Sequence, residues 1–264
     1  MQTDAASYRV KLAETEAERQ AAQRLRYRVF VEEMGAAASP AQRAVRREWD
    51  AFDPYFEQLI LIWDGPPDAP VADPLDRVVG VYRLMTRTAA RAGRGFYGAM
   101  EYDLGLIEAS PRESVELGRT CVAPEHRGGA AMHLMWNALA EYVLARDIGI
   151  LFGAASFAGT DPAPYAEALS FLHHRHLAPP DLRVRAQRPR RIEMDLMPAE
   201  AIDPARALRA IPPLLKAYLR LGGVVGDGAW RDDAFNTIDV CLVMDTDRMK
   251  AQRRAFYERN RSLG

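Results

Sequence analysis

The sequence predicts an α/β or α+β fold built around one sheet, and three observations support this prediction. Strand-like and helix-like segments intermix along the whole chain, which is typical of such folds. The run from Val115 to Phe157 reads as a strand, a basic Gly-rich turn, an apolar helix and a second strand. The chain also shows no internal repeat and no low-complexity linker, so nothing in the sequence points to an array of small modules.

Composition limits the class of protein. The chain has 264 residues, of which 48% are hydrophobic and 27% are charged, enough to build a substantial core. Its net charge of −1 does not favour nucleic acid as a partner. Cys121 and Cys241 lie in apolar, strand-like runs, which predicts buried free thiols in a reducing compartment. The N-terminus lacks the apolar region of a signal peptide, so a cytoplasmic protein is expected, with peripheral contact to a membrane left open.

In the N-terminal half, apolar residues between Thr15 and Met34 recur at four-residue spacing, which predicts a helix, and Thr15 with Glu18 forms a candidate capping box. Strands are expected at Ser7–Leu12, Leu59–Trp63, Val78–Met85 and Val115–Val122. The segments between them are interpreted as a mobile loop at Gly35–Arg47, a proline-rich excursion at Asp64–Asp76, and a strand or turn at Phe96–Leu104.

In the C-terminal half, the helix after the Gly-rich turn is expected to end near Asp147 and to be followed by a strand at Ile148–Phe157. Asp161 is a candidate cap for a helix over Pro164–His176. Further elements are predicted as helices at Ala205–Ala210 and Pro213–Leu221, a Gly/Asp-rich turn region at Val224–Asp233, a strand at Thr237–Met244, and a basic helix from Thr246.

The Gly-rich turn is a candidate site for an anion. Arg127, Gly128 and Gly129 stand between a strand and the start of a helix, where free main-chain N–H groups and the helix dipole attract phosphate. Cys121 and Val122 end the preceding strand, and they would lie beside a phosphate-containing ligand bound at this turn. The alternative interpretation is an ordinary helix start that contains glycine.

Glu116 and Arg119 lie three residues apart on or beside the same strand. We expect Glu116 to accept a proton from an attacking amine, with Arg119 beside it; the alternative is a surface ion pair at a strand end. A nucleophilic Cys121 is a rival mechanism, although no histidine has an evident pairing with it.

A second group of residues suits a zwitterionic amino acid. Arginine pairs with a carboxylate, and aspartate pairs with a cationic side chain. The candidates are Arg26, Phe30, Asp50, Asp53, Arg83 and Asp103. A solvated charged surface is the alternative for each segment.

Other site classes are not favoured. His173, His174 and His176 do not match a common zinc motif, so no metal is expected. The sequence has neither a Gly-x-Ser-x-Gly elbow nor a Gly-x-Gly-x-x-Gly motif after a strand, which argues against a hydrolase of that type and a dinucleotide enzyme. Basic residues between His173 and Arg191 and in the C-terminal tail point to acidic partners, either a carrier protein or anionic lipid.

At these residues the chain resembles the L-ornithine N-alpha-acyltransferase family. The resemblance extends from about Tyr8 to Tyr257. It rests on blocks that include RYRVFVEEMGA, the aspartates of DAFD, VELGRTCVAPEHR, LFGAASFAGTDP and FNTIDVCLVMD. The chain is also similar to acyl-homoserine-lactone synthases, whose helix Arg and Phe, Asp-x-x-Asp pair, strand Arg and Glu-x-x-Arg correspond to Arg26 (or Arg24), Phe30, Asp50 with Asp53, Arg83, and Glu116 with Arg119.

The resemblance implies a GNAT-like fold, with a central mixed, twisted sheet flanked by helices, and a single domain over residues 1–264 with residues 160–264 as its C-terminal extension. It implies an acyl carrier protein thioester of a 3-hydroxy fatty acid as donor, so that phosphopantetheine arrives with the donor and no separate cofactor is needed. It implies the ornithine α-amine as acceptor, giving lyso-ornithine lipid. The usual GNAT turn has glycine where Ala130 stands here, which fits a donor with a single phosphodiester better than coenzyme A.

Three alternatives stay open at this point: the same chemistry on glutamine, an acyl-homoserine-lactone synthase that uses S-adenosylmethionine, and a non-catalytic, membrane-active protein.

Overall fold

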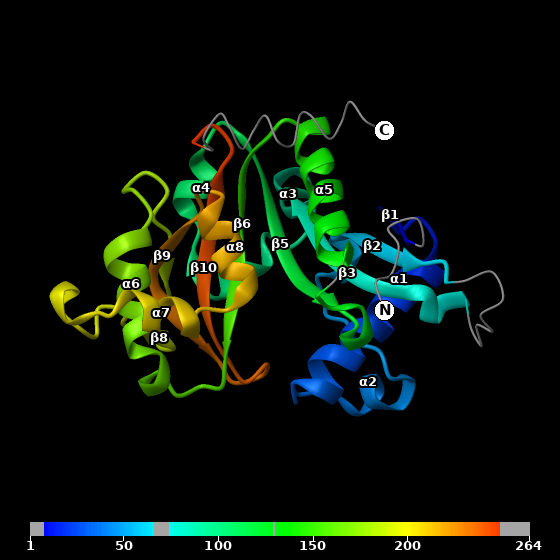
Figure 1. Ribbon diagram of the computed structural model, residues 1–264. Helices are drawn as coiled ribbons and strands as arrows, with labels where there is room; N and C mark the ends of the chain where they lie inside the picture. Colours follow the sequence, from blue (N-terminus) through cyan, green and yellow to red (C-terminus); the bar gives the residue numbers. More distant parts are fainter. Residues whose placement is uncertain (1–7, 66–73, 129, 249–264) are drawn as a thin grey trace. The chain divides into compact units, whose positions relative to one another are not determined.

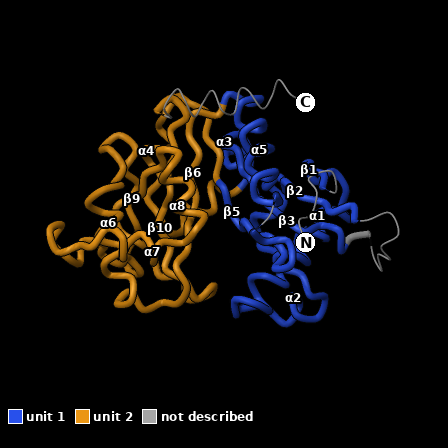
Figure 2. Tube along the Cα trace, viewed as in Figure 1, with its two compact units in different colours: residues 1–93, 117–147, 257–264 blue, residues 94–116, 148–256 orange. Residues whose placement is uncertain are grey.

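The computed structural model describes residues 8–65, 74–128 and 130–248, and they form two compact units (Figures 1 and 2). Of the described residues, unit 1 holds those up to 93 and residues 117–147, and unit 2 holds residues 94–116 and 148–248. Strand β5 (Glu113–Val122) contributes its first four residues to unit 2 and the rest to unit 1. The mixed sheet flanked by helices confirms the predicted fold class, whereas the single domain stays a prediction.

Unit 1 is a sheet with helices packed on it. Strands β1 (Tyr8–Leu12), β2 (Glu57–Trp63) and β3 (Val78–Thr86) form antiparallel pairs in that order, and β5 follows β3. Helices α1 (Glu16–Arg26) and α5 (Ala130–Ala145) pack on this sheet, and β3 is buried along nearly its whole length. Such complete burial explains why β3 reads as a nearly continuous apolar run.

The predicted N-terminal helix changes geometry halfway. The capping box is confirmed: the Thr15 hydroxyl accepts from the Glu18 N–H, and the Glu18 carboxylate accepts from the Thr15 N–H. After Arg26 the chain continues as a π-helix, η2 (Tyr27–Glu33). Segments of π-helix are rare and are often found at functional sites.

The segment Gly35–Arg47 was wrongly interpreted as a loop throughout, because it contains the short helix α2 (Pro40–Val45). Ser39 and Gln42 form a second capping box, and proline occupies the first helical position. Unit 1 also contains helix α3 (Arg87–Ala92).

Unit 2 is built on β6 (Ile148–Ala158), β10 (Thr237–Asp245) and β9 (Val224–Asp232), paired antiparallel in that order. The first residues of β5 pair with β6 in parallel, which makes this sheet mixed. Helix α6 (Ala166–His176) packs on β9, and α7 (Pro204–Ala210) packs on α6. Unit 2 also contains β4 (Tyr102–Asp103), α4 (Gly105–Ala109), β7 (Arg185–Ala186), β8 (Arg191–Ile192) and α8 (Pro213–Arg220).

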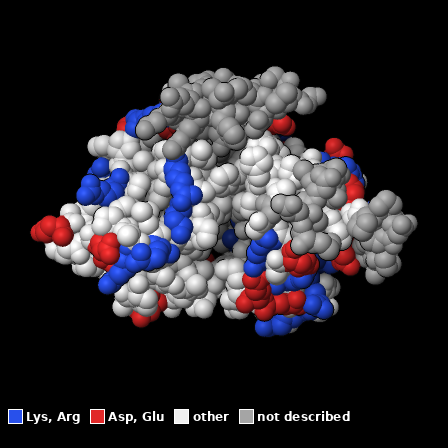
Figure 3. Space-filling view, in the orientation of Figure 1, with Lys and Arg blue, Asp and Glu red and all other residues white. Residues whose placement is uncertain are grey.

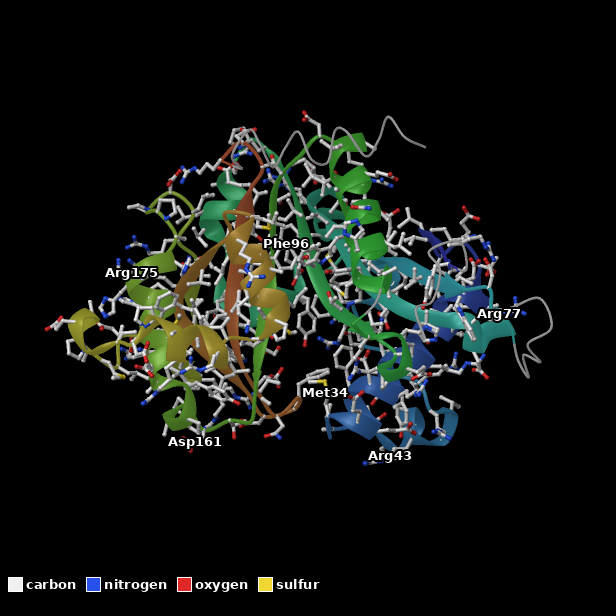
Figure 4. All side chains as sticks on the ribbon, in the orientation of Figure 1. Met34, Arg43, Arg77, Phe96, Asp161 and Arg175 are labelled. Atoms are coloured by element: carbon white, nitrogen blue, oxygen red, sulfur yellow. The ribbon has the colours of Figure 1, made fainter. Side chains whose placement is uncertain are left out.

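The interpretation of Val224–Asp233 as a turn region was wrong, since nearly all of it forms β9. Its glycines suggested a turn, but a Cβ on Gly226 would lie 2.7 Å from Val184 Cγ2, so glycine permits a close approach of two segments. Asp161, labelled in Figure 4, does not cap α6 directly, because its carboxylate accepts from the Ala163 N–H in the turn before the helix. Within the described residues, no helix is long and apolar enough to cross a bilayer.

Candidate active site

A buried cluster of charged side chains lies in unit 1. It joins three arginines and three carboxylates from α1, β3, β5 and the segment before β2. We call it the arginine–carboxylate cluster; its members are Arg26, Arg83, Arg119, Glu48, Asp50 and Asp53. Five of the six were predicted as site residues, and the structure brings those five together.

Arg26, the last residue of α1, lies at the centre of the cluster and its side chain has no exposed surface. Its Nε donates to Glu48 Oε2 over 2.6 Å, and its two terminal nitrogens donate to the Asp53 oxygens over 2.8 and 2.7 Å. Burial by itself would lower the pKa of Arg26, but Glu48 and Asp53 outweigh it and raise the pKa above its ordinary value. Arg26 is therefore charged at any working pH.

Arg83 comes from β3 and joins two of the carboxylates. Its Nη1 donates to Asp50 Oδ2 over 2.7 Å and to Asp53 Oδ1 over 3.1 Å. The guanidinium carbon lies 4.1 Å from the centre of the Phe56 ring, a cation–π contact. Desolvation would raise the pKa of Asp53, but its bonds to Arg26 and Arg83 lower that pKa overall, so this carboxyl is charged as well.

Arg119 approaches the cluster from β5 with an unusual backbone. Its φ is +49°, a left-handed conformation that is uncommon for a residue with a Cβ and that occurs here in the middle of a strand. Its Nε lies 3.3 Å from Glu48 Oε1, and its Nη2 lies 3.4 Å from Asp50 Oδ2. The left-handed turn thus accompanies a side chain that is held by two carboxylates.

Exposure divides the cluster into a buried part and an edge that reaches solvent. The side chains of Arg26, Arg83, Glu48 and Asp53 are at most 9% exposed, whereas Arg119 is 12% and Asp50 is 21% exposed. Asp50 and Arg119 are therefore the members that a small ligand in solvent would meet first.

Glu48 is the member that sequence reasoning missed. One of its oxygens pairs with Arg26 and the other with Arg119, so Glu48 links the arginine of α1 to the arginine of β5. The available signal was its place in REWDAFD, two residues before Asp50 in the same segment. That segment is held in shape by Asp50, whose Oδ1 accepts from the Phe52 and Asp53 N–H groups.

Two further candidate residues for the amino acid are not among the six members of the cluster. Phe30 belongs to η2 in unit 1 and is half-buried. Asp103 belongs to β4 in unit 2, where its carboxylate accepts from the Gly105 N–H.

Glu116, the predicted base, has 4% of its surface exposed and ends the part of β5 that belongs to unit 2. Its oxygens accept from the main-chain N–H groups of Tyr97 and Gly98 over 2.7 and 2.6 Å. Phe96, labelled in Figure 4, precedes these donors. It packs edge-to-face on Phe152 of β6, with ring centres 4.9 Å apart. Two main-chain donors stabilise the carboxylate charge, and an ionised carboxylate has further acceptor positions for a proton.

The predicted donor turn is anchored to unit 1. Arg127 Nε donates to the Val122 carbonyl over 2.9 Å, and its guanidinium forms a two-point ion pair with Glu33. Gly128 has a φ of +77°, which favours glycine at this position before α5. Gly129 lies outside the described residues. Cys121 and Val122 are buried, and burial raises the pKa of the Cys121 thiol to about 12 although Arg26 opposes it.

Among the described residues, two groups of side chains have ligand atoms close enough to hold a metal ion. One is His173, His174 and Asp195, and the other is the buried set Glu101, Asp232 and Asp239. The spacing of the histidines gave no sign of Asp195, because this residue comes from another segment of the chain. Its Oδ1 lies 3.1 Å from His174 Nε2. The described cysteines are both free and buried, as predicted.

Comparisons with known proteins agree with this fold. Residues 25–137 match the family model described as acetyltransferase (GNAT) domain. The chain is 53% identical over 254 residues to the L-ornithine N(alpha)-acyltransferase of Rhodobacter capsulatus, covering 96% of this chain and 95% of the relative. It is 42% identical over 253 residues to the protein of that name from Brucella abortus, covering 95% and 89%.

Among solved structures, an N-acyl amino acid synthase from uncultured soil microbes is similar with a TM-score of 0.51 and 12% identity, over 91% of this chain and 92% of that one. At this identity the likeness concerns the fold alone. Together the relatives and the domain match identify the chain as an acyltransferase enzyme.

Proposed function

We propose, from the premise that this chain belongs to the L-ornithine N(alpha)-acyltransferase family, that it moves a 3-hydroxy fatty acyl group from acyl carrier protein to the α-amine of L-ornithine, giving lyso-ornithine lipid. The observation that carries the proposal is the arginine–carboxylate cluster, in which charges of both signs reach solvent side by side at Asp50 and Arg119. An amino acid with a cationic side chain presents the complementary pair of charges.

For the acceptor, Arg119 binds the ornithine carboxylate and Asp50 binds its distal ammonium. Arg83 is another candidate arginine for the carboxylate, but its side chain is 1% exposed while that of Arg119 is 12% exposed. Arg83 instead acts through Asp50, whose carboxylate it holds at 2.7 Å. The buried members of the cluster thereby hold Arg119 and Asp50, the two groups that bind the substrate, in position.

For the donor, the phosphodiester of the phosphopantetheine arm binds at the turn of Arg127 and Gly128, and the arm passes Cys121 and Val122. Main-chain N–H groups near Arg119 polarise the thioester carbonyl. The left-handed backbone at Arg119 supports this role, because it turns neighbouring peptide groups out of the regular hydrogen-bonding pattern of the strand. Since the arm belongs to the carrier protein, the reaction needs no separate cofactor.

The chemical step is a direct transfer. The α-amine of free ornithine is protonated at neutral pH, so Glu116 or a water next to it accepts a proton before attack. The amine nitrogen then forms a bond to the acyl carbon, the carbon–sulfur bond breaks, and the phosphopantetheine sulfur leaves as a thiolate. This thiolate takes the second proton, which the nitrogen loses as it becomes an amide. The products are the N-acyl amino acid and the free carrier protein.

The test is to incubate the purified protein with 3-hydroxyacyl carrier protein and single amino acids, and to weigh the products. We expect the N-acyl product with ornithine. A product with glutamine alone, or a lactone formed only with S-adenosylmethionine, would replace the proposed acceptor.

Glu116→Gln tests the base. We expect a fall in kcat of about 100-fold, the usual contribution of a general base, in a variant that still folds. Its thermal midpoint should fall as well, because the single amide oxygen cannot accept from both the Tyr97 and the Gly98 N–H in the way that the two carboxylate oxygens do. Glu108→Gln, an exposed acid on α4, is the control and should leave kcat unchanged. A kcat for Glu116→Gln close to that of the unaltered protein would remove Glu116 as the base.

A further inference from the structure

Helices α7 and α8 present a basic surface that sequence reasoning did not single out. Between Pro204 and Gly226 the chain contains four cations and no acidic residue. Figure 3 shows Lys and Arg side chains gathered over these two helices of unit 2. We call Arg209, Lys216 and Arg220 the basic surface.

The cations of the basic surface differ from most arginines of unit 2 because they form no ion pair, as far as residues 8–65, 74–128 and 130–248 are concerned. Arg206 forms an ion pair with Glu167, but within the described part of the chain no carboxylate pairs with Arg209, Lys216 or Arg220. Arg209 and Arg220 are exposed, and Lys216 is half-buried. An unpaired set of like charges produces a field that attracts an acidic partner.

Sequence reasoning indicated two other basic segments for this role, and one of them, the C-terminal tail after Arg248, lies outside the described residues. The other, between His173 and Arg191, differs from α7 and α8 in its ion pairs. Arg191 pairs with Glu193 and Asp227, Arg185 with Asp227, and Arg190 with Asp233. Three of the six arginines of that segment are therefore compensated by carboxylates of unit 2.

Helices α7 and α8 also carry apolar side chains that are not fully buried. Leu208 is 40% exposed, and Leu214 and Leu219 are half-buried, while Leu215 and Tyr218 point into the core. A surface with cations around a small apolar contact suits an acidic, amphipathic helix of a protein partner. A membrane is less well matched, because the helices have only 7 and 8 residues and lack a long apolar stripe.

We infer that the basic surface of α7 and α8 docks the acyl carrier protein that delivers the donor; this rests on the proposed function. Carrier proteins are small, acidic and helical, so their charge is complementary to Arg209, Lys216 and Arg220. The surface contributes to the recognition of the protein part of the donor, and the thioester itself is recognised elsewhere.

The experiment compares two donors with the same acyl group, the acyl carrier protein and an acyl-pantetheine without protein. In the double variant K216E/R220E we expect KM for the acyl carrier protein to rise at least tenfold. The kcat/KM for acyl-pantetheine should stay within twofold of the unaltered protein, which also shows that the variant is folded. The control is R43E/R91E, which changes the net charge equally through two exposed arginines of unit 1 and should leave both donors unaffected.

Each outcome has one interpretation. An unchanged KM for the acyl carrier protein in K216E/R220E overturns the inference while the proposed function stands. Loss of binding to anionic phospholipid vesicles with unchanged carrier kinetics also overturns it and identifies the partner as lipid. If the unaltered protein uses acyl-pantetheine as well as it uses acyl carrier protein, the proposed donor fails as well.

Discussion

Glu48 joins the two arginines that reach the arginine–carboxylate cluster from different elements. Its side chain is 6% exposed and its partner Arg26 is fully buried, so neither charge can be satisfied by water if the pair is broken. A buried ion pair contributes little net stability compared with an apolar pair, but the loss of one partner is costly because it leaves a charge without compensation.

Glu48→Gln should therefore lower the free energy of unfolding by about 3 kcal/mol, measured by urea denaturation. The matched control is Glu125→Gln, which removes the partner of Arg28 from a pair that is about half exposed and should cost less than about 1 kcal/mol. Equal effects of the two substitutions would contradict the assignment of Glu48 to a buried network.

Cys121 tests whether the enzyme forms an acyl-enzyme intermediate. Because burial raises the pKa of its thiol to about 12, about one thiol in 10⁴ is ionised at pH 8, and the thiol lacks the reactivity of a catalytic nucleophile. Cys121→Ala should keep kcat within about threefold of the unaltered protein, a range that allows for a small packing change. An acyl adduct on Cys121, detected by mass spectrometry after an acid quench, would show the opposite.

At the scale of elements, helix α1 carries both a stability signal and a site residue. Its first turn is closed by the capping box of Thr15 and Glu18, and its last residue is Arg26. The cap fixes where the helix begins, and the helix then places the arginine guanidinium at the cluster.

Partial burial would raise the pKa of Glu18, but its bonds to the Thr15 and Glu14 N–H groups and to Lys11 lower it to about 2, from an ordinary value of 4.5. Since the folded-state pKa is depressed, the stabilisation is fully present above about pH 4.5 and is lost as the pH falls towards 2. In Glu18→Gln the free energy of unfolding should therefore depend less steeply on pH in this window, as measured by urea denaturation at a series of pH values. Glu108→Gln is the control, and an equally flattened slope there would argue against the cap.

Strand β5 shows how one element serves both units. Its residues Glu113–Glu116 pair with β6, and the left-handed conformation of Arg119 follows within its second half. The spacing of Glu116 and Arg119 placed both on one strand, but an ideal strand would have pointed them to opposite faces. The left-handed backbone at Arg119 departs from ideal strand geometry, and no pattern in the sequence predicted this conformation.

For the whole molecule, 35 basic and 36 acidic residues nearly cancel. The electrostatic attraction of a partner must therefore come from local surfaces, such as the basic surface of α7 and α8. Salt weakens such attraction, since the Debye length falls from about 30 Å at 0.01 M to about 10 Å at 0.1 M ionic strength.

The kcat/KM for acyl carrier protein should accordingly fall several-fold when ionic strength rises from 0.01 to 0.1 M, because steering of a charged partner is screened. The kcat/KM for acyl-pantetheine, measured in the same buffers, should change much less. An equal salt effect on both donors would place the charge dependence at the reaction site and not at a docking surface.

The chain's local patterns were sufficient for most elements and for the residue types of the site. Apolar periodicity, caps and turn residues identified α1, α6, β3 and β10, because these signals act between neighbours in sequence. Prediction failed where short-range signals conflicted with long-range packing, as in the glycine-containing strand β9. A glycine of this strand is needed because a segment that is distant along the chain packs closely against it.

The arrangement of charges in the site depends on the folded chain. Sequence named Arg26, Asp50, Asp53 and Arg83 but could not say that Glu48 completes their balance, or that Asp50 and Arg119 form the exposed edge. Burial and ion pairing are properties of groups that meet across many residues, so they arise only when helix α1, strands β3 and β5 and the Glu48–Asp53 segment pack together.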